Sequence, residues 1–221
     1  MKNLLLAFAA LDRVRTELGG FSSDNKRFAD PGMNQGLDAQ YKGKWDPTTA
    51  NERIDQRQRQ HTQKSVEINT LRGARAPQTA AEVINYGGQV FAKKVGNCLE
   101  LASAVAWYLH NEERNKIDTC DLVKYVGADH VFVAIGQALP AKNGQYPKDF
   151  GAWDDDAAIC DVWADIACPA REYPTRWRQR MGNWATMNIL LAPPTGYLRV
   201  RPTDPAWYDI VNLPKISHIL R

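Results

Sequence analysis

Cys98, His130 and Asp161 are the residues whose types and spacing could do covalent chemistry in this chain. Cys98 follows Asn97 and begins an apolar run that continues to residue 110, which places a cysteine at the start of a predicted buried helix. A helix N-terminus carries partial positive charge and free backbone N–H groups, which favour a thiolate and could stabilise an oxyanion. A nucleophilic cysteine also needs a histidine within hydrogen-bond reach and a group that orients the imidazole. We therefore predict a Cys–His–Asp site.

Three predicted strands must position the histidine and the aspartate. They are rich in β-branched, aromatic and small apolar residues and cover residues 121–126, 130–135 and 157–163. His130 begins the second strand, and Asp161 lies in the third with Trp163 on the same face by the two-residue period. Helix 98–110 packed across these strands would bring Cys98 to their edge. The predicted fold class is α+β, a small antiparallel sheet with the cysteine helix across it.

The N-terminal third differs from the rest of the sequence in the spacing and number of its apolar residues. Residues 1–18 show helical spacing of apolar side chains, residues 19–48 are irregular, and residues 49–72 are polar with few apolar anchors. We predict that residues 1–72 form a helical, partly irregular extension and that residues 73–221 form the main domain. Two further predicted helices, residues 78–86 ended by Gly87-Gly88 and residues 173–187, lie in that domain.

Composition excludes several functional classes. The net charge of +3 is far from that of a dedicated nucleic-acid-binding protein, so we expect no nucleic-acid partner. No apolar run approaches the roughly 20 residues that a membrane-spanning helix needs. The four cysteines contain no CxxC pair, so the sequence predicts neither a zinc ribbon nor a disulfide scaffold, and it indicates no cofactor.

Three blocks resemble the active-site blocks of papain-like cysteine hydrolases. Residues 96–102 read GNCLELA and resemble the block that begins the catalytic helix, and residues 129–136 read DHVFVAIG and resemble the histidine strand. Residues 161–163 read DVW and match the family's Asn-x-Trp block with Asp for Asn. Ala92 stands where the family has its oxyanion-hole glutamine, and Gln89 is the nearest substitute. Cys98 and His130 are 32 positions apart, which is more similar to the compact transglutaminase-like and bacterial effector branches, including the Pasteurella toxin deamidase domain.

The resemblance implies acyl transfer through a cysteine thioester. It assigns Cys98, His130 and Asp161 as catalytic residues, Asn97 and Gln89 as oxyanion or support residues, and Trp163 as a shield over the orienting hydrogen bond. The implied substrate is a host or competitor protein, and glutamine deamidation, proteolysis and transglutamination stay open. The resemblance also implies a bacterial effector or toxin, made in the cytoplasm and then secreted or translocated, with residues 1–72 available to a secretion or chaperone partner.

Two other readings of the same residues remain open at this point. One is a non-catalytic protein-interaction module that retains the fold, suggested by the polar stretch 49–72 and the missing glutamine. The other is a thiol-redox or metal protein that uses Cys98, Cys160 and His130. Within the site itself, Asp129 and Asp165 compete with Asp161 as the orienting carboxylate.

Overall fold

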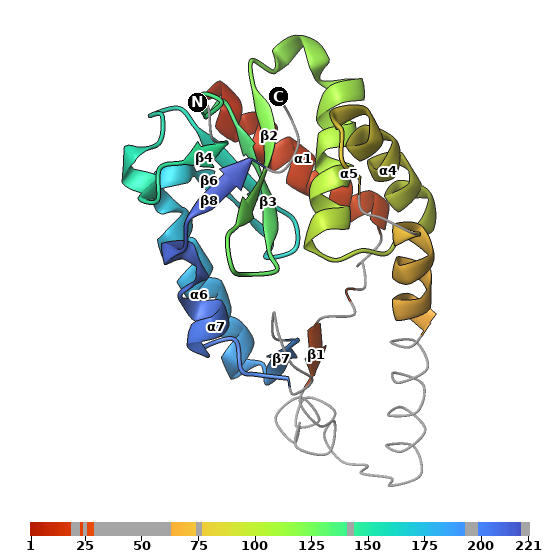
Figure 1. The fold of residues 1–221 in the computed structure, drawn as a ribbon, viewed down its shortest axis with the longest axis vertical. Coiled ribbons are helices and arrows are strands. Elements are labelled where there is room, and N and C mark those ends of the chain that lie inside the picture. The colour runs from red at the N-terminus through yellow and green to blue at the C-terminus, as the bar shows by residue number, and fades with distance from the viewer. Residues whose placement is uncertain are drawn as a thin grey trace, which may run out of the picture.

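A computed structural model describes residues 1–18, 23, 26–28, 63–73, 77–140, 144–192 and 199–217. It confirms the predicted α+β class: a six-stranded antiparallel sheet carries helices packed against it (Figure 1). In spatial order the strands are β4 (Gln145–Tyr146), β8 (Lys215–Ser217), β2 (Cys120–Tyr125), β3 (Val131–Ile135), β5 (Ala158–Asp161) and β6 (Ile166–Pro169). A separate antiparallel pair is formed by β1 (Lys26–Phe28) and β7 (Ile189–Leu191).

The helices lie on both sides of this sheet. Figure 1 shows α4 and α5 beside it on one side and α6 and α7 on the other. Their bounds are α1 (Lys2–Leu18), α4 (Ala80–Lys93), α5 (Cys98–Glu112), α6 (Tyr173–Thr186) and α7 (Pro205–Tyr208). Short 3₁₀ turns lie between helices and strands or between two strands: η2 (Arg114–Lys116), η3 (Phe150–Ala152), η4 (Ala170–Glu172) and η5 (Ile210–Asn212). The predicted helix start at Cys98, the helix near residues 173–187 and the existence of the three central strands are confirmed. Two predicted placements are wrong: His130 immediately precedes β3, and Trp163 lies in the turn after β5 rather than on that strand, because β5 ends at Asp161.

Helix α4 is longer than predicted because a glycine pair does not end it. The prediction placed the helix end at Gly87-Gly88, but α4 runs on to Lys93. A Cβ on Gly87 would lie 2.1 Å from the Ser103 carbonyl oxygen, so the missing side chain lets α4 and α5 approach closely. Close packing against a neighbouring helix, rather than helix termination, explains this glycine.

The remaining strands of the sheet were not predicted. β6 follows β5 through a tight turn in which Asp165 adopts a positive φ of 59°. β8 lies near the C-terminal end of the sequence and pairs with β2, and β4 lies between β3 and β5 in the sequence and pairs with β8. These are short edge elements whose partners lie far away in the sequence, so local patterns do not reveal them.

Helix α1 is part of the main hydrophobic core. Leu6, Val14 and Leu18 are buried, and α1 contacts α5, β5 and β6. The predicted division of the chain at residue 72 stays a prediction, but α1 and the sheet share one core. Residues 29–62, with the first part of the polar stretch 49–72, lie outside the described residues. Residues 63–72 are helical, and Ile68 within them is fully buried.

No helix among the described residues has both the length and the apolarity that crossing a membrane requires.

The neighbouring leucines of α1 provide a matched test of this packing. Leu6 is 5% exposed, whereas Leu5 is 65% exposed. Leu6→Ala should lower the free energy of unfolding by about 2–5 kcal/mol, because it removes buried methyl groups and leaves a cavity. Leu5→Ala should change it by no more than about 0.5 kcal/mol. Urea unfolding followed by circular dichroism measures both. Equal small effects would show that α1 does not contribute to the core in solution.

Candidate functional site: a buried histidine–aspartate pair

His130 and Asp161 are in direct contact inside the protein. The Nε2 atom of His130 lies 2.8 Å from Oδ2 of Asp161, and the two side chains are 0% and 1% exposed. Their strands explain the contact: β3 and β5 are adjacent and antiparallel, with Val133 opposite Cys160, so the start of β3 lies beside the end of β5. The predicted pairing of a strand-start histidine with a strand aspartate is therefore present.

Asp161 is the carboxylate on the ring, which settles a choice that the sequence left open. Asp129 is exposed, and Asp165 instead forms ion pairs with Arg15 and Arg180. Burial by itself would raise the pKa of the Asp161 carboxyl. The charge and hydrogen bonds of its neighbours, His130 first, outweigh burial and hold this pKa below its usual value.

Two more donors complete the hydrogen bonding of Asp161. The Tyr173 hydroxyl donates to Oδ2 at 2.6 Å, and the backbone N–H of Ala164 donates to Oδ1 at 3.0 Å. Tyr173 is fully buried and begins α6. Sequence reasoning missed Tyr173, because only the packing of α6 onto the sheet brings residue 173 to residue 161. The one available signal was that a buried tyrosine hydroxyl usually requires a polar partner.

The hydrogen-bond network selects one tautomer of His130. An ionised Asp161 accepts hydrogen bonds only, so Nε2 of the ring must carry the proton that lies between them. In the neutral ring Nδ1 is then a bare acceptor. Nδ1 is buried and has no hydrogen-bond partner among the described residues. The pair thus leaves Nδ1 as the ring nitrogen to which no described residue forms a hydrogen bond.

Aromatic side chains enclose this imidazole. The rings of Trp177 and Trp163 lie 4.8 and 5.1 Å from it, and Trp207 and Tyr125 lie 6.3 and 6.2 Å away, all measured between ring centroids. Trp163 is 1% exposed, and its position beside His130 agrees with the predicted shielding of the orienting hydrogen bond. The two side chains are buried, and the low local dielectric strengthens their electrostatic interaction.

Cys98 lies at the backbone on either side of His130. Its thiol donates to the carbonyl oxygen of Asp129 at 3.6 Å, and the backbone N–H of Val131 is also close enough to favour the thiolate. Cys98 is the first residue of α5, as predicted. No hydrogen bond joins the Cys98 thiol to the His130 ring in the described part of the chain. The structure thus joins two members of the predicted triad, and the contact of the third with His130 stays a prediction.

Burial disfavours the thiolate form of Cys98 in this conformation. Its side chain is only 4% exposed, and burial raises its pKa well above the usual value. The nearby carboxylates of Asp129 and Glu100 raise the pKa further, and the Val131 N–H offsets only part of this. The positive end of α5 therefore does not by itself produce a thiolate here.

A buried carboxylate fixes the start of α5. Glu100 is fully buried and accepts hydrogen bonds from Arg72 at 2.9 and 3.1 Å and from the Tyr86 hydroxyl at 2.8 Å. It also accepts from the backbone N–H of Asn97 at 2.9 Å, which caps the helix. These bonds tie the first turn of α5 to α4 and to helix 63–72. Glu100 thus positions Cys98 through the backbone.

A segment from the N-terminal region lies over the same edge. Ser23 donates to the Asn97 side chain at 2.6 Å and accepts from the Trp163 indole N–H at 3.3 Å. Lys26 donates to the Trp163 carbonyl oxygen, and its ammonium lies 4.4 Å from the centroid of the Trp163 ring. Burial lowers the pKa of Lys26 to about 7, although Asp161 opposes the shift. Asn97 is thus held by Ser23 at its side chain and by Glu100 at its backbone N–H.

The other predicted site residues lie elsewhere or have other roles. Gln89 is exposed on α4, and its side chain makes no hydrogen bond to another described residue, so the structure gives it no contact with the thiol. Cys160 is buried within β5, next to Asp161 in sequence. Among the described residues no group of three or more His, Cys, Asp or Glu side chains could hold a metal ion.

Comparison with family models, with curated proteins and with solved structures found no match for this chain.

The lowered pKa of Asp161 has a consequence for stability. A carboxyl whose folded-state pKa lies below its unfolded value of about 3.9 stabilises the fold above that pH. This contribution is lost as the pH falls through the folded-state pKa. Asp161→Asn should therefore lower the free energy of unfolding by about 1–3 kcal/mol at pH 6, and the difference from wild type should shrink on acidification.

Denaturant unfolding between pH 2.5 and 6 measures this difference. Asp155→Asn is the control, because the Asp155 side chain is 99% exposed. A difference between wild type and Asp161→Asn that stays constant with pH would mean that the Asp161 carboxyl is not ionised in the folded protein.

Proposed function

We propose that this protein is a cysteine-dependent amide hydrolase that acts on a protein substrate through Cys98, His130 and Asp161. The observation that carries the proposal is the buried His130–Asp161 pair, which leaves Nδ1 without a partner next to the helix that begins at Cys98. A buried imidazole held by a carboxylate at one nitrogen and unoccupied at the other is the arrangement that a general base requires. Glutamine deamidation and proteolysis both fit this chemistry.

In the proposed reaction Nδ1 of His130 removes the thiol proton as sulfur attacks the amide carbonyl carbon. The imidazolium returns that proton to the leaving nitrogen as the C–N bond breaks, which yields a thioester and ammonia or an amine. Water then attacks the thioester, His130 takes a proton from this water, and the thiol is released with the acid product. Asp161 holds the ring tautomer and stabilises the imidazolium, while N–H groups at the start of α5 stabilise the oxyanion.

The burial and the raised pKa of the Cys98 thiol determine how the proposed reaction must begin. Because the Cys98 pKa is raised, deprotonation must accompany attack rather than precede it as a stable thiolate–imidazolium pair. Substrate must also gain access to a side chain that is only 4% exposed. Ser23 forms hydrogen bonds with both Asn97 and Trp163. In the proposed reaction, displacement of Ser23 gives substrate access to the start of α5.

The biological setting belongs to the same proposal. The resemblance to compact bacterial effector enzymes supports a protein made in a bacterium and exported to act on a host or competitor protein. Residues 1–72 would then serve a secretion or chaperone partner, although α1 is also needed for the core.

A second candidate is a protein-interaction module that keeps the fold without catalysis. The burial of the Cys98 thiol, its raised pKa and the exposed position of Gln89 favour this reading. The two candidates differ in what they predict for Cys98. A catalytic thiol must become accessible in the folded protein, whereas a structural thiol becomes accessible only on unfolding.

Alkylation of the native protein separates the two candidates. Iodoacetamide should modify Cys98 faster than Cys160 or Cys168, and the rate should rise with pH above neutrality, because the folded-state pKa of Cys98 is raised. His130→Gln should slow this reaction by about tenfold or more, because the variant lacks the general base. Loss of a general base costs about 10²-fold or more in a full catalytic reaction, and alkylation uses only part of that effect. Peptide mass spectrometry at timed intervals gives the rate at each cysteine.

Cys160→Ser is the control variant and should leave the Cys98 rate unchanged. If all four cysteines react together, at the rate of global unfolding, the interaction module is the better reading.

Activity itself is tested with an unfolded, glutamine-rich protein substrate and intact-mass analysis. Deamidation gives a small mass increase for each amide converted to an acid, and proteolysis gives fragments. Cys98→Ala and Cys98→Ser should abolish either product while the circular dichroism spectrum remains native. Full activity in Cys98→Ala would refute the proposed nucleophile.

A further inference from the structure

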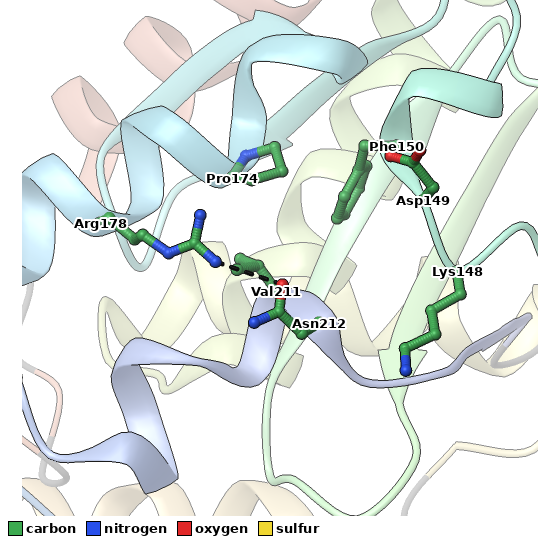
Figure 2. A pocket seen from close by; sticks show the side chains of 7 residues that line it. All are labelled: Lys148, Asp149, Phe150, Pro174, Arg178, Val211 and Asn212. Carbon is green, nitrogen blue, oxygen red and sulfur yellow. Dashed lines mark hydrogen bonds between the residues drawn. The ribbon is translucent and has the colours of Figure 1, made fainter.

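A pocket of about 560 Å³ lies between η3, the start of α6 and η5 (Figure 2). Cys98, His130 and Asp161 are not among its lining residues. Basic, acidic, apolar and amide side chains surround it: Lys148, Asp149, Phe150, Pro174, Arg178, Val211 and Asn212. Its composition and its place in the fold mark it as a site distinct from the histidine–aspartate pair.

Arg178 differs from the other arginines of α6 in having no carboxylate partner among the described residues. Arg176 pairs with Glu172 at 3.1 Å, and Arg180 pairs with Asp165 at 3.0 Å. Arg178 instead donates one hydrogen bond to Oδ1 of Asn212 at 3.2 Å across the pocket, drawn as the dashed line in Figure 2. A guanidinium has five N–H donors, so most of its hydrogen-bonding capacity remains for a ligand.

Two lysines add positive charge around the same pocket. Lys148 lines it, and no described carboxylate lies within ion-pair distance of its ammonium. Lys215 is fully buried, and its ammonium donates to the backbone carbonyls of Lys148, Val211 and Leu213 at 2.6, 3.1 and 3.1 Å. The one acidic lining residue, Asp149, uses its carboxylate to cap the Gly151 N–H at 2.8 Å. Asp149 keeps its negative charge, but Lys148 and Arg178 outnumber it in the lining, so the net formal charge of the lining is positive.

The pocket also has apolar lining. Phe150 and Val211 are each 2% exposed and belong to the core, and Pro174 adds a ring at the first turn of α6. Figure 2 shows Phe150 and Pro174 on one side of the opening, with Val211 and Asn212 on the other. An apolar surface beside basic groups favours a ligand with an anionic end and a compact apolar body.

We propose that this pocket binds a small organic anion, with a carboxylate or phosphate group held by Arg178, on the side of the pocket opposite Lys148, and an apolar body against Phe150, Pro174 and Val211. The planar guanidinium can bind either oxyanion through two parallel N–H bonds, and Lys148 adds a point charge. The proposal does not depend on the hydrolase reaction, because none of the three proposed catalytic residues lines the pocket.

The test titrates the full chain with phenyl phosphate and, separately, phenylacetate, followed by NMR of backbone amides. Both probes should shift the signals of the lining residues, whereas inorganic phosphate and benzyl alcohol, each lacking one half of the ligand, should bind at least about fivefold more weakly. The stronger of the two aryl probes identifies whether the natural head group is a phosphate or a carboxylate.

Charge-removing variants locate the site. Arg178→Gln should weaken the better probe by about fivefold, as expected for the loss of one partly exposed charge contact, and Lys148→Gln, which removes a charge farther from the anion, should weaken it by about twofold. Arg176→Gln, the same change in the same helix at an arginine that is already paired with Glu172, should leave binding unchanged. Equal weakening by Arg176→Gln, no weakening by the other two, or no binding of either probe would each overturn the proposal.

Discussion

The buried Asp161 carboxylate is a constraint that three separate elements of the fold must satisfy together. Transfer of an isolated carboxylate into a protein interior costs several kcal/mol, so the group is tolerated only when donors surround it. Here the donors come from three separate elements: His130 immediately before β3, Tyr173 at the start of α6 and the Ala164 N–H in the β5–β6 turn. The sheet, the turn and α6 must therefore all be in place for the carboxylate to stay ionised, which links the site to overall folding.

A second buried carboxylate, Glu100, joins α5 to α4 and to helix 63–72. It also raises the pKa of the nearby Cys98 thiol. Glu100 anchors the first turn of α5 to Tyr86, Arg72 and the Asn97 N–H, which sets the position of Cys98. The group that places the sulfur thus also disfavours its thiolate form. In the proposed reaction the thiolate forms as Nδ1 of His130 takes its proton, and no described residue forms a hydrogen bond to Nδ1.

The sequence predicted the helices and strands that local residue patterns determine. A glycine and an asparagine before an apolar run gave the helix start at Cys98, and β-branched residues gave the strands that position His130 and Asp161. Tyr173 could not be found in this way, because its partner is reached only through the packing of α6. Gly87 was misread because a glycine that permits close helix contact and a glycine that ends a helix look the same in one sequence. The choice among Asp129, Asp161 and Asp165 likewise required their neighbours in space.

Phe150 and Tyr173 link the proposed anion pocket to the histidine–aspartate pair. Phe150 lines the pocket, and its ring centroid lies 5.4 Å from that of Tyr173, whose hydroxyl holds Asp161. Pro174, the next residue, lines the pocket from α6. A ligand that shifts the first turn of α6 would therefore move a hydrogen-bond donor of the histidine–aspartate pair. Because interiors are close-packed, such a shift is transmitted rather than absorbed. Arg178 and Lys148 are not part of this link, and for that reason their substitution can separate binding in the pocket from any change at His130.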